Sequence, residues 1–173
     1  DFMHYEGDAD IPDPWDGENN HHCYFDVLQI LDVSGMSSFE LGLHAEIDSA
    51  ASDESWGFNH LSITFNDGTA AGTGTVVESS DLSWSNTQTY DAGGSEGIVN
   101  GFWGGEVNSV TTTVPVPDGA TSALLRLRYW AIDSWDGGET ASVTMDGSVL
   151  WALDRASYGQ CDGSNGDFMH YEG

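Results

Sequence analysis

The chain has 173 residues and a formal net charge of −26, which arises from 29 acidic and three basic side chains. Such a surface repels phosphates and anionic lipid headgroups, so nucleic acid and membrane surfaces are poor partners. Seven tryptophans favour a folded core over disorder, and the apolar runs are too short for membrane insertion.

The first and last seven residues of the chain are identical. Residues 1–7 and 167–173 both read DFMHYEG, which sets a period of 167 − 1 = 166 residues. A period of this length has the size of one domain and predicts a tandem array of domains. An affinity tag or a duplicated terminal strand are the alternatives. We therefore expect one unit of a longer periodic chain, with residues 167–173 starting the next repeat.

The segments up to residue 67 alternate between acidic loops and strands. Proline and glycine interrupt residues 8–18 (DADIPDPWDGE), which predicts an acidic loop. The apolar run at 24–31 has the length of a buried strand, and 39–47 alternates apolar and polar residues at period two. A second acidic loop is predicted at 48–56, and a third strand at 61–65.

The segment 69–80 (TAAGTGTVVESS) is rich in small and hydroxylated residues. This composition predicts a connector between repeats or a short edge strand. Candidate sites for O-linked glycans are Thr69, Thr73 and Thr75. N-glycosylation is not expected, because the chain contains no Asn-x-Ser/Thr sequon.

The second half of the chain also alternates at period two. Arg126 and Arg128 share one face of a predicted strand, where each can fork onto carboxylates as a structural clamp. Asp146-Gly147 fits a two-residue hairpin turn. Because no segment repeats at period 3.6, we predict an all-β fold with almost no helix, an antiparallel β-sandwich of the jelly-roll-like kind. The strands predicted here are 110–114, 125–131, 141–145 and 149–153.

Clustered carboxylates in three loops are candidate Ca²⁺ ligands, because Ca²⁺ takes six to eight oxygen ligands at flexible geometry. A solvated acidic surface is the alternative. The candidate ligands form three clusters: Asp133, Asp136 and Glu139; Asp16 and Glu18; Asp53 and Glu54. Tryptophans in the same loops are candidates for stacking on sugars, although core packing is the more frequent use of tryptophan. These are Trp15, Trp56 and Trp135.

Several short motifs resemble a jelly-roll-like module of very large extracellular proteins of protists. The matching motifs are Ile132–Glu139, Val143–Trp151, Trp15–Glu18 and Asp53–Gly57, with departures at Gly138 and Phe58–His60. The order of motifs in that module implies a shifted repeat boundary. Residues 1–67 are then the C-terminal half of one repeat, 68–80 a connector, 81–166 the N-terminal half of the next, and 167–173 the start of a further copy.

The resemblance also implies a disulfide across the repeat boundary. Read through the repeat, Cys161 and the next Cys23 are 23 + 166 − 161 = 28 residues apart; free buried thiols are the alternative. The chain, whose last seven residues repeat its first seven, also resembles the repeat proteins of glycan-coated extracellular fibrils seen in environmental water samples.

We expect no enzyme activity and assign no catalytic residue from the sequence. It contains no phosphate-binding loop or dinucleotide fingerprint, and its GxSxG match at residues 93–97 (GGSEG) is not followed by the helical pattern that a nucleophile elbow requires. We therefore expect a structural protomer of an extracellular fibre, which contacts copies of itself, binds Ca²⁺ and carries O-linked glycans. A carbohydrate-binding module, lectin-like or adhesin-like, is the alternative.

Overall fold

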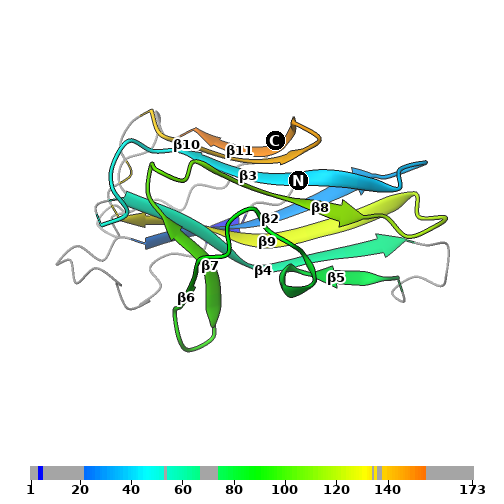
Figure 1. Cartoon of the computed structure of the whole chain (residues 1–173), viewed down its shortest axis with the longest axis horizontal. Helices are drawn as coiled ribbons and strands as arrows, with labels where there is room; N and C mark the ends of the chain where they lie inside the picture. Colours follow the sequence, from blue (N-terminus) through cyan, green and yellow to red (C-terminus); the bar gives the residue numbers. More distant parts are fainter. Residues whose placement is uncertain are drawn as a thin grey trace.

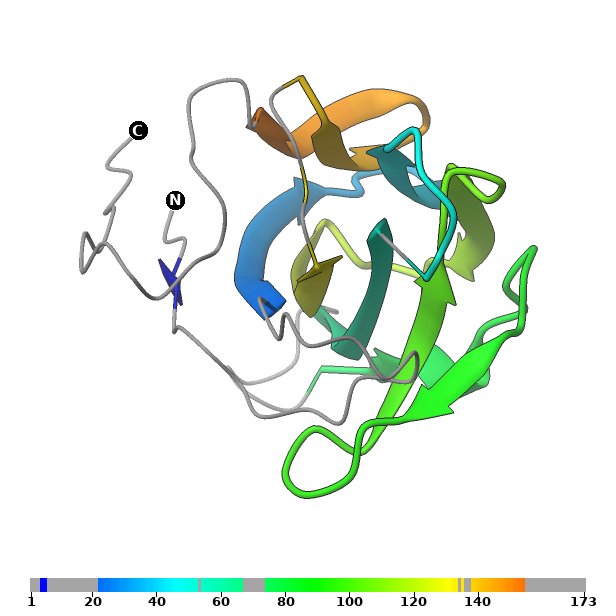
Figure 2. The ribbon, with the colours of Figure 1, turned by 90° about the vertical axis from the view of Figure 1, so that its left-hand side faces the viewer.

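The structure is a computed structural model that describes residues 4–5, 22–52, 54–66, 74–133, 135 and 138–154, with the backbone alone at 4, 5, 22, 23, 133 and 154. Two antiparallel sheets pack against each other around one main hydrophobic core (Figure 1). The view along the strands shows both sheets curving around this core (Figure 2). The all-β sandwich predicted from the sequence is confirmed. The described part of the chain contains no helix capable of spanning a membrane.

Among the residues that the structure describes, the larger sheet has seven strands and the smaller sheet has four. In the larger sheet the order is β1-β2-β9-β4-β7-β6, and β5 pairs with β4; in the smaller it is β11-β10-β3-β8. The strands are β1 His4–Tyr5, β2 His22–Asp32, β3 Ser38–Glu46, β4 Glu54–Asn66, β5 Val76–Glu78, β6 Thr89–Asp91, β7 Ile98–Trp103, β8 Ser109–Pro115, β9 Ser122–Asp133, β10 Thr140–Met145 and β11 Ser148–Asp154, and Ser79–Asp81 form a short 3₁₀ helix.

The period-two patterns correctly predict which side chains of a strand are buried in the core. In β3 the side chains of Phe39, Leu41 and Leu43 are buried, whereas Glu40 between them is exposed. The predicted hairpin turn at Asp146-Gly147 is also confirmed. Both residues have positive φ, 48° and 76°, and Met145 pairs with Ser148 across the turn.

Strand β4 is longer than its sequence pattern predicts. It starts at Glu54, inside the segment predicted as a loop, and pairs with β9 from Glu54 to Asn66. A β-bulge between Asn59 and Ser62, where His60 has a φ of 50°, shifts the pairing. Because a bulge breaks the alternation of faces, the period-two signal appears only after it.

Strand β7 lies within residues 93–105, a segment rich in glycine. Glycines on both strands let the backbones of β4 and β7 approach closely. A Cβ added to Gly57 of β4 would lie 2.6 Å from the carbonyl oxygen of Asn100, and one added to Gly101 of β7 would lie 2.8 Å from that of Trp56. Part of the predicted connector is a strand as well. Residues Val76–Glu78 form β5 at the edge beside β4, which was the second interpretation of that segment.

An ion-pair clamp on the outer face of the larger sheet joins Arg128 to the carboxylates of Asp26 and Glu96. The Nε and Nη2 atoms of Arg128 donate to the carboxylate of Asp26 at 2.8 and 2.9 Å, and Nη1 donates to both oxygens of Glu96 at 3.0 Å. The guanidinium carbon also lies 3.7 Å from the centroid of the Tyr24 ring. The predicted clamp is confirmed for Arg128. Arg126 is exposed and forms no ion pair with the residues that the structure describes, so its part in a clamp stays a prediction.

Candidate metal centre

Two of the predicted acidic loops meet at one end of the sandwich. One connects β3 to β4 and the other connects β9 to β10. The indole Nε1 of Trp135, in the second loop, donates to the carbonyl oxygen of Ser55 at 3.0 Å, at the start of β4. Both groups are buried, so this hydrogen bond fixes the second loop to the start of β4 in a water-poor environment.

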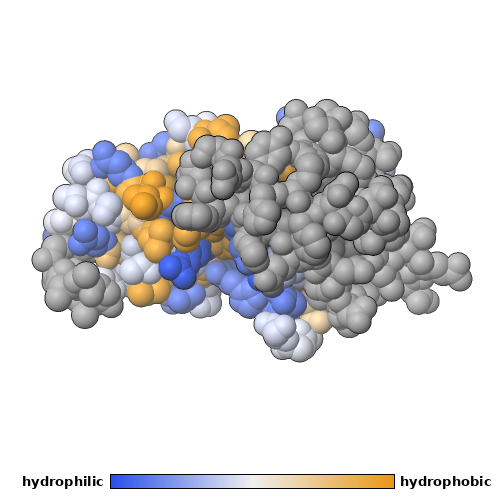
Figure 3. All heavy atoms as spheres, turned by 180° about the vertical axis from the view of Figure 1, so that it is seen from behind, coloured by the Kyte–Doolittle hydropathy of each residue, from blue (hydrophilic) through white to orange (hydrophobic). Residues whose placement is uncertain are grey.

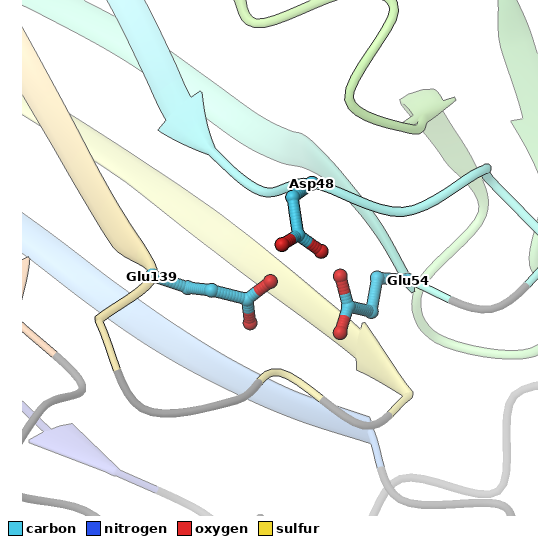
Figure 4. A group of neighbouring side chains, drawn as sticks. All are labelled: Asp48, Glu54 and Glu139. Atoms are coloured by element: carbon cyan, nitrogen blue, oxygen red, sulfur yellow. The ribbon is translucent and has the colours of Figure 1, made fainter.

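Three carboxylates converge where these loops meet (Figure 4). Asp48 lies two residues after β3, Glu54 is the first residue of β4, and Glu139 directly precedes β10. One carboxylate oxygen from each lies within 4.8 Å of the other two. We call these three residues the acidic triad. Asp48 is exposed, whereas Glu54 and Glu139 are only 3% and 7% exposed.

The burial of Glu54 needs a compensating partner. Its Oε2 atom is buried and has no hydrogen-bond partner among the described residues. Burying an ionised carboxylate is costly unless it is paired or coordinates a metal, and neighbouring carboxylates add mutual repulsion. A hard divalent cation would relieve both costs. Two oxygens bound to one Ca²⁺ at 2.3–2.6 Å are at most about 5 Å apart, so the spacing of the triad is compatible with shared coordination.

The triad combines residues that the sequence analysis placed in separate clusters. Glu54 and Glu139 were predicted as ligands of two different sites, but the fold brings them into one. Asp48 was missed as a ligand, although it belongs to the acidic loop predicted at 48–56. The other candidate ligands, which are Asp16, Glu18, Asp53, Asp136 and the side chain of Asp133, lie outside the described residues.

The candidate glycosylation and disulfide residues are mostly outside the described part of the chain. This is so for Thr69, Thr73, Cys161 and the side chain of Cys23. Thr75 is described and is exposed next to β5. Its carbonyl oxygen accepts a hydrogen bond from the Phe65 amide at 2.8 Å, so the backbone is held in the sheet while the side chain remains at the surface.

The tryptophans of these loops pack in the core and not at the surface. Trp56 and Trp135 are 0% and 1% exposed, and Trp56 stacks on Tyr129 with ring centroids 5.7 Å apart. A ring that stacks on a sugar must present one face to solvent, so this burial argues against the sugar-stacking alternative at both positions. Trp15 lies outside the described residues, and the six tryptophans within them are all buried.

Comparisons of the chain with protein-family models, with curated protein sequences and with solved structures found no match. They give no support to the resemblance to a module of protist proteins. The candidate site therefore depends on its geometry alone.

Proposed function

We propose that this chain is the structural protomer of an extracellular fibre built from tandem 166-residue β-sandwich repeats. In this proposal Ca²⁺ stiffens each repeat, and O-linked glycans cover the surface at Thr75 and the neighbouring threonines. The observation that carries the proposal is the heptad DFMHYEG. It recurs after one period of 166 residues, and its first copy contributes β1 to the edge of the larger sheet.

The strand order supports one folding unit per period. Strand β2 lies beside β9, and β3 lies beside β10, so strands from both halves of the chain are neighbours in each sheet. Neither half can complete a sheet by itself. A tandem chain of such units would form a row of sandwiches, each joined to the next by the heptad.

The depression that the described surface contains over the smaller sheet offers no indole ring for stacking on a sugar. An open depression lies over the outer face of the smaller sheet, lined by His44, Glu46, Ser109, Thr140 and Thr144 among others. No tryptophan lines it. The lectin-like alternative would need an aromatic platform, and Trp15 is the one candidate left for it.

The fibre is tested with a two-repeat protein, in which residues 8–173 are appended after Gly173. We expect an elongated particle in electron micrographs, with two sandwiches at one fixed spacing. A fixed spacing follows because a short joint that adds a strand to a sheet restricts rotation of the next unit. Two sandwiches at variable distances, as expected for a flexible linker, would contradict the proposed fibre.

Binding of Ca²⁺ to the acidic triad is expected to raise the melting temperature of the chain. A ligand at about 100 times its dissociation constant stabilises the folded state by about 2.7 kcal/mol. For a domain of this size, that energy corresponds to a rise of about 5–10 °C. The measurement is circular dichroism during heating, in EDTA and then with added Ca²⁺.

Two matched variants show whether the Ca²⁺-dependent rise in melting temperature comes from the acidic triad. Asp48→Asn keeps the shape of the side chain but removes one charged ligand, so it should abolish most of the Ca²⁺-dependent rise. Asp118→Asn removes an exposed acid from the turn between β8 and β9 and should leave the rise intact. If chelation leaves the melting temperature of the unmodified chain unchanged, the cation site is wrong.

A further inference from the structure

We propose that the β7–β8 loop, residues 104–108, positions the ligands of the acidic triad, and that Gly105 is the residue that fixes the backbone on both sides of Asp48. This inference deepens the proposed function, because it rests on the binding of Ca²⁺ to the triad. The loop itself supplies none of the three carboxylates.

The triad lies at an end of the sandwich where the chain crosses between the two sheets. Asp48 follows β3 and Glu139 precedes β10, both in the smaller sheet, whereas Glu54 begins β4 in the larger sheet. The β7–β8 loop also crosses between the sheets here, beside the β3–β4 loop (Figures 1 and 2). A cation bound by all three carboxylates would link the two sheets, so the placement of these loops decides whether the ligands meet.

Glu54 gives independent evidence that the carboxylates are aimed at a common point. Its side chain is buried, and its Oε2 atom forms no hydrogen bond with the described residues. Figure 4 shows the carboxylates of Asp48, Glu54 and Glu139 pointing toward one another. Asp48 is the exposed member, so burial does not fix its side chain. Its position depends on the backbone that carries it.

Hydrogen bonds attach that backbone to the β7–β8 loop on both sides of Asp48. Before it, the Ala45 amide donates to the carbonyl oxygen of Asn108 at 3.1 Å. After it, the carbonyl oxygen of Ser49 accepts from the Gly105 amide at 2.9 Å. The segment that carries Asp48 is therefore held at two points by a single short loop.

The β7–β8 loop is in turn attached to the core. The carbonyl oxygen of Val107 accepts from Nε1 of Trp56 at 2.8 Å, and the Val107 amide donates to the carbonyl oxygen of Gly104 at 3.0 Å. The Gly104 amide donates to Oε1 of Glu106 at 3.3 Å. Trp56 is fully buried and lies two residues after Glu54. The loop thus connects the segment after β3 to the strand that carries Glu54.

Gly105 allows the close approach that this attachment requires. A Cβ added there would lie 2.5 Å from the carbonyl oxygen of Ile47 and 3.2 Å from that of Ser49. These are backbone atoms on either side of Asp48, so they cannot turn aside as the end of a flexible side chain can. Gly105 is not among the glycines with positive φ, so the added methyl group would be the main effect of an alanine. Alanine would displace the segment that carries Asp48.

Gly105→Ala in the chain of residues 1–173 tests the positioning role. Residues that orient metal ligands typically contribute 10–100-fold to affinity, so we expect Ca²⁺ binding to weaken by about 10-fold or more in isothermal titration calorimetry. Gly42→Ala is the matched control and should bind Ca²⁺ as tightly as the unmodified chain. Its Cβ would meet only side-chain atoms, Oγ1 of Thr144 at 2.6 Å and Nε2 of His44 at 2.7 Å. Near-ultraviolet circular dichroism in EDTA establishes that each variant is folded.

A variant at the other end of the molecule separates binding at the triad from association of chains. Bound cations reduce the repulsion between such negative chains and so favour association through apolar surface. Apolar side chains reach the surface near the end where β2 stops (Figure 3), and Ile30 of β2 is 81% exposed. Ile30→Ser should leave the affinity for Ca²⁺ unchanged. Loss of binding in this variant would overturn the assignment to the triad.

Glu106 provides a second test, which adds no bulk and remains informative if Gly105→Ala does not fold. Glu106→Ala removes the acceptor of the Gly104 amide. Glu106→Gln removes the same charge but keeps an acceptor oxygen. We expect alanine to weaken Ca²⁺ binding several-fold more than glutamine does. Equal affinities in the two variants would overturn the positioning role.

The cation site and its positioning loop fail in different ways. If the unmodified chain binds no Ca²⁺, the site is wrong and the positioning role fails with it. If the unmodified chain binds Ca²⁺ and Gly105→Ala binds it equally tightly, only the positioning role is overturned. A lower melting temperature of Gly105→Ala in EDTA, with unchanged affinity for Ca²⁺, is the result for a purely structural glycine and also overturns it.

Discussion

Replacing Trp56 with alanine is expected to lower the free energy of unfolding by about 3–5 kcal/mol. The indole is fully buried, and its ring centroid lies 4.8 Å from that of Trp103 and 5.7 Å from that of Tyr129. Its Nε1 also donates to the carbonyl oxygen of Val107 at 2.8 Å. Alanine would leave a large cavity and an acceptor without its donor, and urea unfolding monitored by circular dichroism measures the loss.

The Trp56→Ala variant also tests whether Trp56 is a core residue or a surface residue that binds sugar. If Trp56 were a binding residue at the surface, alanine would cost little stability and would reduce affinity for a glycan. Trp56→Phe is the matched control, because phenylalanine keeps most of the buried ring area and should recover much of the lost stability. A Trp56→Ala chain as stable as the unmodified protein would contradict the packing described above.

Replacing Arg128 with leucine should be the second large loss, about 2–4 kcal/mol, because it leaves two partly buried carboxylates without their cation. Glu96 is 13% exposed and Asp26 is 41% exposed, so Glu96 should account for more of the cost. Arg126→Leu is the matched control, since it removes the same charge from the same face of β9 without breaking a described ion pair. Equal losses in the two variants would contradict the clamp.

Lowering the pH should reduce the loss of unfolding free energy that Arg128→Leu causes. Burial by itself raises the pKa of Glu96, but the charge of Arg128 and hydrogen bonds involving His60, Arg128 and Asn59 together hold that pKa below its ordinary value. In the unmodified chain this lowered pKa contributes stability above the unfolded pKa of Glu96, and the contribution is lost as pH falls through the folded pKa. Without Arg128, only the hydrogen bonds of His60 and Asn59 oppose the raising effect of burial on this pKa, and protonation of Glu96 then relieves the unpaired charge. The difference in unfolding free energy between the two chains should therefore be larger at neutral pH than below pH about 4.

The sequence was sufficient to predict the class of fold because its strongest signals are local. The alternation of residues 39–47 and the Asp146-Gly147 turn each need no knowledge of distant partners, and both are confirmed. The start of β4 could not be predicted in the same way. The bulge at His60 interrupts the alternation, and pairing with β9 determines the strand.

The candidate site shows the limit of local patterns more clearly. Acidic loops were visible in the sequence, but nothing local indicates that Glu54 and Glu139, which are 85 residues apart (139 − 54), share one site. Their proximity follows from the pairing of β4 with β9 and of β3 with β10. Nothing local distinguishes Asp48 from Asp53 and Glu54, because all three are acids of the same predicted loop.

The heptad links the sequence to the proposed assembly, and the composition of the chain offers a direct test of its periodicity. Arg126, Arg128 and Arg155 are the only basic residues for trypsin to cleave after, since the chain has no lysine. In a periodic molecule, the longest tryptic peptide of the natural, deglycosylated and reduced material begins at Ala156, passes from Gly173 directly into Asp8, and ends at Arg126. Mass spectrometry that finds this peptide would support the tandem fibre. Finding in its place one peptide that starts at Asp1 and another that ends at Gly173, in equal amounts, would contradict it.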